Sequence, residues 1–408
     1  MSTFLPEPQG VRMNDKLRIA IPIHSLDPGG VERVALGLAA QWRQAGHDVT
    51  IVLGRAGGSH LASAPALDYW QIPSRVSTAS WETPWMVYCL YSYLIAHEAD
   101  VLFLPGNTYA VVGAAMKLLL GDHAPPMALK VSNALSRPDM PAPLRSGYAV
   151  WLGVQGRLFE RLIGLSEAMA REIRETTGAA AEQVDVIANP VLPRARLRAL
   201  AKRERRPASV WGTRYLTAGR LVTQKNHAMM LRAFARAARP SDRLTIAGDG
   251  PERATIARLA SELGIGERVH LAGHLASIDP LMAEADAFVL SSDYEGLPGV
   301  VVEALAAGLP VLSTNCCVSM DGLVESGRTG LLVPRGDERA FAEGLTCIRD
   351  FAGDPARARA IASRYEVENA AQRYLDMMTQ MRRERDAQRR QRLGVSAWAR
   401  HAPWQRSL

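Results

Sequence analysis

Cysteine is scarce in this chain, and long apolar runs are missing. Only four cysteines occur among 408 residues, and two of them, Cys316 and Cys317, are adjacent. They make neither a C-x-x-C pair nor an even framework of spaced pairs, so we expect reduced thiols in a cytoplasmic protein. No run of about 18 apolar residues free of charge is present, which argues against a membrane-spanning helix. The opening residues, MSTFLPEPQGVRMNDK, lack the basic and apolar segments of a signal peptide.

Excess positive charge is absent from most of the chain, although the formal net charge is +7. Residues 382–408 carry eight arginines against Glu384 and Asp386, and residues 194–206 carry seven cations against Glu204. Each segment therefore contributes +6, and the remaining residues are mildly acidic at −5. This confinement argues against nucleic-acid binding. The segment at 194–206 either contacts an anionic surface or forms an exposed linker helix.

Apolar, strand-like runs alternate with helical segments along the chain, in two series. The first series has runs at 17–23, 49–53, 100–106, 127–133, 161–166 and 184–190, and the second at 214–220, 243–250, 269–274, 287–292, 310–315 and 330–334. This alternation is typical of parallel sheets that are covered by helices on both faces. It predicts an α/β protein with two doubly wound domains and a cleft between them.

A domain boundary is expected where Pro190, Pro193 and the basic run interrupt the apolar periodicity. The helical pattern at 365–381 predicts a last helix that packs back onto the first domain. The expected segments are a disordered tail at 1–15, a first domain at 16–193, a basic linker at 194–207, a second domain at 208–364, the returning helix at 365–381 and a basic mobile tail at 382–408.

Two cations follow the strand at 214–220 and precede a helix that begins near His227. Arg220 and Lys225 are five residues apart in this loop. A guanidinium and an ammonium beside free helix amides can grip a diphosphate, the first as a fork and the second as a point charge. The alternative is a pair of solvated loop cations.

Glycines follow two other strands. Gly248 and Gly250 predict a tight turn, but Arg253 takes the place of the third glycine of dinucleotide-binding folds, which weakens a nicotinamide interpretation. Gly29 and Gly30 lie between the first strand and its helix, where backbone amides can meet a phosphate or a sugar. In both places a purely structural turn is the alternative.

A pair of carboxylates lies in the stretch 291–315. Glu295 falls in the loop after a buried strand, and Glu303 falls about one turn inside the following helix. Open parallel sheets bind ligands at this end of their strands. Taken alone, the pair suggests acid and base catalysis. Beside Arg220 and Lys225, it suggests groups that hold the hydroxyls of a sugar and a ribose.

Together these motifs resemble family 4 of the retaining glycosyltransferases. The matching pieces, spread over residues 19 to 335, are GGVERVALGLA, VIANPV, AGRLVTQKNH, AGDGP and DYEGLPGVVVEALAAGLPV. The resemblance implies the GT-B architecture, an α/β fold of two Rossmann-like doubly wound domains facing across a cleft. It also implies transfer of a sugar from a nucleotide-diphosphate sugar, with retained configuration and without a metal or other cofactor.

The resemblance assigns roles to individual residues. Arg220 and Lys225 match the cations that hold the diphosphate and stabilise the leaving group. Glu303 matches the carboxylate that binds the ribose hydroxyls, and Glu295 matches the one that faces the donor sugar. The other residues expected to bind the donor are Gly30, Gly248, Gly250, Leu297, Pro298 and Gly299.

The chain departs from the family at one place. Many members carry a histidine after the fourth or fifth strand of the first domain, where it touches the donor sugar. Here the sequence is KVSNALSRPD, and Ser132 or Asn133 takes that position. Asn133 can donate and accept at a hydroxyl but cannot act as a base. His24 and His123 are candidate substitutes or simply structural histidines, and no base is needed if the departing phosphate accepts the acceptor's proton.

The acceptor is expected to bind the first domain near residues 70–93, which are rich in Trp and Tyr. These rings either stack on sugar, sit at a membrane interface or pack into the core. Our partner hypothesis is a lipid-linked sugar at the cytoplasmic membrane face, with the arginine-rich tail attracted to anionic lipid. The predicted function is surface polysaccharide or lipopolysaccharide synthesis. Its alternatives are another GT-B enzyme, such as a sugar-nucleotide epimerase, and a non-enzymatic nucleotide-binding protein.

Overall fold

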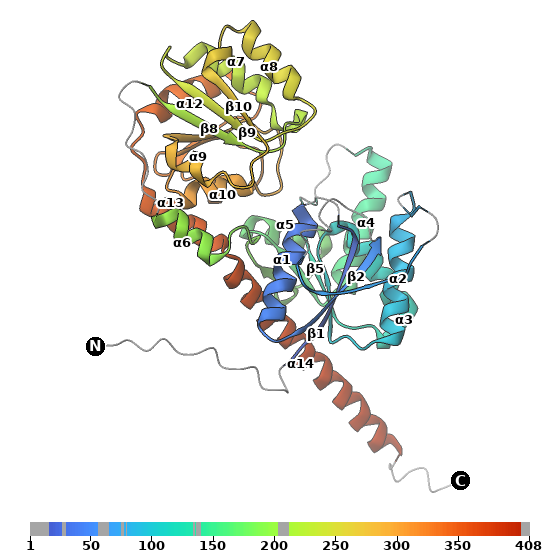
Figure 1. The fold of residues 1–408 in the computed structure, drawn as a ribbon. Helices are drawn as coiled ribbons and strands as arrows, with labels where there is room; N and C mark the ends of the chain where they lie inside the picture. Colours follow the sequence, from blue (N-terminus) through green and yellow to red (C-terminus); the bar gives the residue numbers. More distant parts are fainter. Residues whose placement is uncertain are drawn as a thin grey trace, which may run out of the picture. The chain divides into compact units, whose positions relative to one another are not determined.

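The computed structural model describes residues 16–26, 30–55, 65–74, 77–78, 80–133, 135, 140–202 and 212–400, with side chains up to residue 392. The chain divides into two compact units (Figure 1). Unit 1 combines residues 1–188 with residues 370–408, and unit 2 consists of residues 189–369. The tail expected at 1–15 and the last residues, 401–408, lie outside the described part of the chain.

Unit 1 is built on a parallel sheet of seven strands in the order β3-β2-β1-β4-β5-β6-β7. The strands are β1 (Arg18–Ser25), β2 (Asp48–Arg55), β3 (Asp68–Gln71), β4 (Val101–Leu104), β5 (Met127–Lys130), β6 (Arg161–Gly164) and β7 (Val184–Val186). The central strands β4, β5 and β6 are buried along their whole length, which explains their mainly apolar sequences, although β5 ends in Lys130 and β6 begins with Arg161. Because the strand order reverses between β1 and β4, the loops after these two strands are neighbours.

Helices cover both faces of this sheet and create two apolar cores. One core lies under α2 (Glu82–Ala96), α3 (Ala110–Leu120), α4 (Ala142–Leu158) and α5 (Glu167–Thr177). The other lies under α1 (Gly30–Gln44) and the last helix, α14 (Val367–Arg400). Trp42 is central to this second core: its indole N–H donates to the Ala371 carbonyl at 3.0 Å, and its ring meets Phe103 and Tyr374 edge to face.

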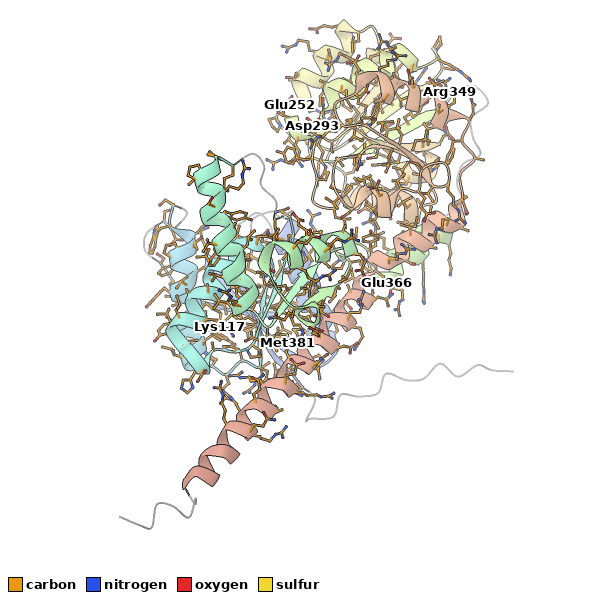
Figure 2. The ribbon with its side chains drawn as sticks, turned by 180° about the vertical axis from the view of Figure 1, so that it is seen from behind. Lys117, Glu252, Asp293, Arg349, Glu366 and Met381 are labelled. Carbon is orange, nitrogen blue, oxygen red and sulfur yellow. The ribbon has the colours of Figure 1, made fainter. Side chains whose placement is uncertain are left out.

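The basic segment expected as a mobile tail from residue 382 is instead helical. α14 continues to Arg400, beyond the buried Met381 (Figure 2). Contacts with unit 1 explain why: Glu384 accepts from the Arg161 guanidinium at 2.9 Å, and Arg382 donates to the Lys16 carbonyl at 2.8 Å. An ion pair and a hydrogen bond thus hold the first turn of this segment against the domain.

Unit 2 is built on a parallel sheet of six strands in the order β10-β9-β8-β11-β12-β13. The strands are β8 (Arg214–Ala218), β9 (Arg243–Ala247), β10 (Val269–Gly273), β11 (Ala287–Leu290), β12 (Val311–Thr314) and β13 (Gly330–Val333). The order reverses between β8 and β11, so the loops after these two strands meet at one edge of the sheet. Two parallel sheets with interleaved helices confirm the predicted α/β class.

The helices of unit 2 lie between these strands in sequence. They are α6 (Arg194–Lys202), α7 (His227–Ala237), α8 (Arg253–Glu262), α9 (Asp279–Glu284), α10 (Gly299–Ala306), α11 (Met320–Leu323), α12 (Glu338–Arg349) and α13 (Pro355–Ala362). α6 occupies the start of the segment expected as a basic linker, and it contacts α10. The basic run is therefore partly a packed element of unit 2.

Two further expectations concern membrane spans and thiols. Among the described residues, no helix is both long enough and apolar enough to cross a bilayer. All four cysteines are free thiols, with Cys89 and Cys316 buried.

Candidate functional site

Lys225 and Glu295 meet at the edge of unit 2 where the strand order reverses. Lys225 ends the short 3-10 helix Thr223–Lys225 after β8, and Glu295 lies in the loop after β11. Their side chains form an ion pair and are only 16% and 12% exposed. The Ser292 hydroxyl donates to the same Glu295 oxygen at 2.8 Å. The structure thus brings together two residues that are 70 positions apart and that the sequence predicts for one site.

The two loops are also joined through the Ser291 hydroxyl and through Asn226. The Ser291 hydroxyl donates to the Lys225 carbonyl at 2.8 Å. Asn226 adopts a left-handed conformation (φ 46°) and caps α7 by accepting from the Met229 amide at 3.3 Å. Its amide group donates to Asp293 at 2.9 Å. This cap fixes the start of α7, and so the position of the preceding lysine.

The two glycines after β9 have a structural reason to be glycine. A Cβ atom on Gly248, at φ +140°, would lie 1.9 Å from the Gly219 carbonyl oxygen. A Cβ atom on Gly250 would lie 2.4 Å from the Leu221 carbonyl oxygen. The loops after β8 and β9 therefore pack backbone against backbone, which only glycine permits. Donor binding by Gly248 and Gly250 stays a prediction.

Arg220 is not drawn into the Lys225–Glu295 pair. It is exposed, and its guanidinium pairs with none of the residues that the structure describes. In the other loop, Leu297 is half-buried, Pro298 is the cap residue of α10 and Gly299 is its first residue. These four residues lie on the loops that the strand reversal makes neighbours, with a solvated guanidinium available for an anion.

Glu303 lies in α10 and pairs with an arginine that the sequence does not single out. Its two carboxylate oxygens accept from the two terminal nitrogens of Arg196, each at 3.2 Å. Arg196 also donates to Asp279 at 2.8 Å. The sequence shows Arg196 only as one cation of a basic run, because both of its partners are more than 80 residues away.

His227 is the first residue of α7 and is buried beside this site. Its Nδ1 atom has no hydrogen-bond partner among the described residues. Burial, reinforced by the nearby charge of Lys225, lowers the pKa of His227 to about 4. The ring is therefore neutral at physiological pH and adds no charge to the cationic loop.

A second group of polar side chains lies at the strand reversal of unit 1. His24, near the end of β1, donates its backbone N–H to the Tyr109 hydroxyl at 3.1 Å, and the two rings stack at 4.7 Å. Burial lowers the pKa of His24, and its Nδ1 has no partner among the described residues. Gly30 is exposed at the first position of α1, and no described atom lies within 4 Å of where its Cβ would be.

The loop after β5 completes this group. Asn133 is exposed, and its carbonyl accepts from the Asn107 amide at 3.5 Å, while the Asn107 oxygen accepts from the Ser132 backbone at 2.8 Å. His123 belongs elsewhere: it lies in the short helix Gly121–His123 after α3. Thus His24 lies near the end of β1 and Asn133 lies in the loop after β5, and these two strands flank β4 in the sheet, whereas His123 precedes β5.

Lys130, the last residue of β5, was missed by sequence reasoning. It is 2% exposed, and its ammonium donates to the Ser132 hydroxyl at 3.3 Å. Burial lowers the pKa of Lys130 to about 8, although the charge of Glu32 opposes the shift. The available signal was a lysine inside the apolar run MALKV. Buried amines with shifted pKa values concentrate at functional sites.

Metal ligation would require several donor side chains to converge. Within the described ranges, no three His, Cys, Asp or Glu residues are grouped so that they could hold a metal ion. Independence from metals stays a prediction.

Two family models match most of the chain. Residues 28–194 match the model described as Glycosyltransferase Family 4, and residues 212–349 match the one described as Glycosyl transferases group 1.

Curated relatives match smaller parts. An exopolysaccharide phosphotransferase of Streptomyces coelicolor is 27% identical over 68% of this chain and 29% of its own length. The lipopolysaccharide core biosynthesis glycosyltransferase LpsE of Rhizobium meliloti is 36% identical over 33% of this chain and 38% of its own length. The chain therefore spans well under half the length of these relatives.

Solved structures resemble the chain over most of its length. Anabaena HepE in complex with UDP has a TM-score of 0.70 and 23% identity, covering 89% of this chain and 100% of that one. The lipopolysaccharide outer core galactosyltransferase WaaB has a TM-score of 0.68 and 17% identity, covering 87% and 98%. At these identities the likeness concerns the fold, and it confirms the GT-B type of α/β fold expected from the sequence.

Proposed function

This chain belongs to the group 1 glycosyltransferases, and we propose that it is a retaining hexosyltransferase of surface polysaccharide or lipopolysaccharide synthesis. Its donor would be a nucleotide-diphosphate sugar and its acceptor a glycan or a lipid-linked sugar. The observation that carries the proposal is the Lys225–Glu295 pair at the strand reversal of unit 2. Relatives named for lipopolysaccharide core synthesis, and a similar fold solved with UDP-glucose, support it.

Lys225 and Arg220 supply the positive charge that a departing diphosphate requires. When the bond between the anomeric carbon and the phosphate oxygen breaks, negative charge develops on the diphosphate and positive charge on the sugar ring. Cations already held in place lower the energy of that state without reorganising. Lys225 is held by Glu295, whereas Arg220 is solvated and has its whole guanidinium to offer. This division predicts that Lys225 sets geometry and Arg220 adds charge.

The carboxylates hold hydroxyls in this proposal. Glu295 faces the donor sugar and Glu303 the ribose, so neither has to move a proton. The acceptor hydroxyl forms the new bond to the anomeric carbon on the face that the diphosphate leaves, and its proton passes to a phosphate oxygen of the leaving group. Configuration is thereby retained. Since the two cations neutralise the diphosphate, we expect no metal requirement.

The test is donor specificity followed by product stereochemistry. Thermal unfolding of the full chain with a panel of nucleotide sugars should reveal one stabilising donor, by about 2.7 kcal/mol at 100 times its dissociation constant. NMR of the transferred sugar should then show the donor's anomeric configuration. An inverted product overturns the retaining assignment. Donor binding without transfer to any glycan, with a changed sugar configuration instead, indicates the epimerase alternative.

Peripheral membrane contact at the cytoplasmic face is the second part of the proposal. Exposed apolar side chains are Tyr88 and Ile95 on α2, Val111, Leu118 and Leu119 on α3, and Leu144 and Val150 on α4. α2 contacts α3, and α3 contacts α4, so these residues occupy neighbouring helices. Ile95 and Leu118 are 62% and 83% exposed. Exposed apolar groups on adjacent helices are typical of surfaces that bind a membrane or a protein.

A further inference from the structure

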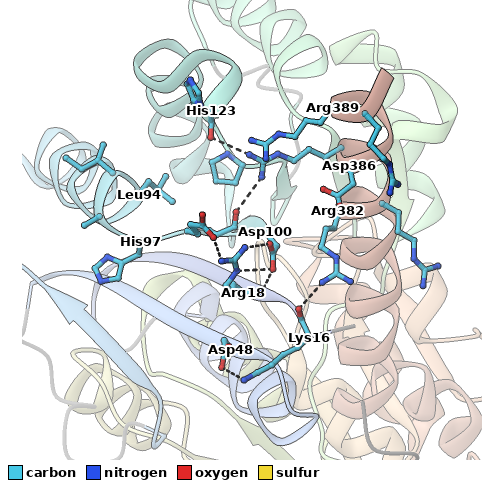
Figure 3. A pocket seen from close by; sticks show the side chains of 18 residues that line it. Lys16, Arg18, Asp48, Leu94, His97, Asp100, His123, Arg382, Asp386 and Arg389 are labelled. Carbon is cyan, nitrogen blue, oxygen red and sulfur yellow. Dashed lines mark hydrogen bonds and ion pairs between the residues drawn. The ribbon is translucent and has the colours of Figure 1, made fainter. Parts of the chain in front are cut away.

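A polar cavity of about 970 Å³ lies at the amino-terminal edge of the unit 1 sheet. Its walls are the starts of β1, β2 and β4, the end of α2, and the arginine-rich turns of α14 (Figure 3). The arginines in the wall are Arg18, Arg382, Arg383, Arg385, Arg389 and Arg390. We call this space the arginine cavity.

The carboxylates of the arginine cavity are mostly committed to cations of the sheet edge. Arg18 pairs with Asp100 at 2.8 Å and also with Glu98, and Lys16 pairs with Asp48 at 2.8 Å (Figure 3). Asp386 on α14 is the only other carboxylate among the described lining residues. The cations of the sheet edge are therefore neutralised, whereas Arg385, Arg389 and Arg390 of α14 form no ion pair with the carboxylates that the structure describes.

Three of the α14 arginines that line the cavity carry uncompensated charge next to one another. Arg385, Arg389 and Arg390 form no ion pair with any carboxylate that the structure describes. Arg385 is half-buried, and its guanidinium reaches the carbonyls of Ala99 and His123 at 3.5 Å, which is long for a hydrogen bond. Burial, together with the charge of Arg389, lowers the pKa of Arg385. A bound anion would reduce the electrostatic repulsion among these clustered cations.

Apolar surface adjoins the arginine cavity. Leu94 and Ile95 from the end of α2 line it, and Ile95 is also one of the exposed apolar residues of the α2–α3 surface. Leu118 and Leu119 lie at the end of α3, just before the short helix that leads to His123 in the cavity wall. A molecule that bears a phosphate next to an apolar body would satisfy both surfaces.

We propose that the arginine cavity binds the phosphate of an anionic phospholipid headgroup, with the acyl region on the apolar residues of α2 and α3. Arginine suits this task because its fork donates two hydrogen bonds to one phosphate. The site is separate from the transfer chemistry, since β1 separates Arg18 from His24 by about 20 Å of extended chain. The inference rests on the proposed membrane contact and not on the transfer reaction.

Flotation of the full chain with vesicles tests the site. We expect the wild-type protein to float with vesicles of phosphatidylcholine plus 30% phosphatidylglycerol, and R385Q/R389Q/R390Q to lose at least tenfold in bound fraction. The matched control is R232Q/R258Q/R339Q, which removes the same charge from exposed positions of unit 2 and should float like the wild type. Equal flotation of both triple variants overturns the site.

Two more arms separate the alternatives. R389Q/R390Q leaves the half-buried Arg385 in place and serves as the test if the triple variant folds poorly. It should show a loss of bound fraction between the wild type and the triple variant. Glycerol phosphate should protect the wild-type protein from thermal unfolding weakly and the triple variant not at all. Protection by glycerol phosphate without any flotation assigns the cavity to a free phosphate and overturns the lipid source. Flotation that ignores headgroup charge leaves the membrane contact standing and removes the site.

Discussion

Arg196 on α6 and Glu303 on α10 are joined by two parallel hydrogen bonds of 3.2 Å. The guanidinium is shared with Asp279 at the start of α9, so one cation holds two carboxylates from different elements. Glu303 is the residue proposed to hold the donor ribose. Its orientation therefore depends on an arginine from the segment that links the two domains in sequence.

Arg196→Gln should weaken donor binding. The variant removes the two hydrogen bonds that Arg196 donates to Glu303 and leaves two partly buried carboxylates close together, so we expect about a tenfold higher Kd for the nucleotide, or about 1.4 kcal/mol. Calorimetric titration with the nucleoside diphosphate measures it. Arg194→Gln, which alters a neighbouring cation bonded to Glu366, is the control and should keep the wild-type Kd. An unchanged Kd for Arg196→Gln would remove the positioning role.

Lys225→Ala should reduce turnover by roughly 100-fold, because a held cation at the leaving group contributes a few kcal/mol to barrier lowering. Arg220→Ala should reduce turnover by a similar factor. Initial rates at saturating donor give the comparison. Lys117→Ala breaks a similar ion pair, with Glu160 in unit 1, and should retain normal turnover. Near-normal rates for both loop variants would show that the assignment of the cationic loop is wrong.

His227 should make stability fall in mild acid. Its pKa is about 4 in the folded chain and near 6.5 when unfolded, so below pH 6.5 the unfolded state binds a proton that the folded state refuses. Stability is then full above pH 6.5 and declines towards pH 4, by about 3 kcal/mol for this residue. Denaturant unfolding at pH 7.5 and pH 5 should show a smaller decline for His227→Gln than for the wild type.

The exposed His270 provides the reference for that comparison. His270→Gln should follow the wild-type decline. Parallel curves for His227→Gln and the wild type would mean that the ring is not held neutral by its surroundings.

Lys130→Met should stabilise the folded protein and slow sugar transfer. The Lys130 pKa of about 8 lies below its unfolded value near 10.5, so a buried ammonium lowers stability at neutral pH by about 3 kcal/mol, and the loss disappears as pH rises to 10.5. Lys130→Met should thus unfold at higher denaturant than the wild type at pH 7, with a gap that narrows by pH 9.5. Lys202→Met, at an exposed position, should show no such gap.

We also expect Lys130→Met to transfer sugar more slowly, because a buried charge that destabilises its own fold is typical of a functional site. A variant that is more stable and equally active would reduce Lys130 to a structural residue.

Much of the fold followed from local patterns. The central strands are short apolar runs between turn residues, as at 101–104 and 287–290, and those patterns predict buried parallel strands directly. β3, with the sequence DYWQ, was not predicted, because an edge strand is only partly buried and needs no apolar run. The helix at residues 382–392 was not predicted, because contacts with distant partners such as Arg161 and Lys16 hold it.

The candidate site likewise has residues that local patterns predict and residues that they do not. Lys225 and Glu295 could be paired from sequence, because each follows a strand and parallel sheets gather such loops at one edge. The role of Arg196 could not be predicted from sequence, because it depends on ion pairs with Glu303 and Asp279, which no local pattern connects to it. The packing reason for Gly248 could not be predicted either, because the Gly219 carbonyl that a Cβ atom would meet lies in a different loop.

The return of the chain to unit 1 at Ala370 has a consequence for synthesis on the ribosome. Trp42 and Phe103 emerge early, but Tyr374, which packs against both, is made only after all of unit 2. At about 5–20 residues per second, this face of the first domain waits roughly 10 to 35 seconds for its covering helix. Unit 2 can therefore finish folding before unit 1, and the nascent chain must shield an open apolar face throughout that interval.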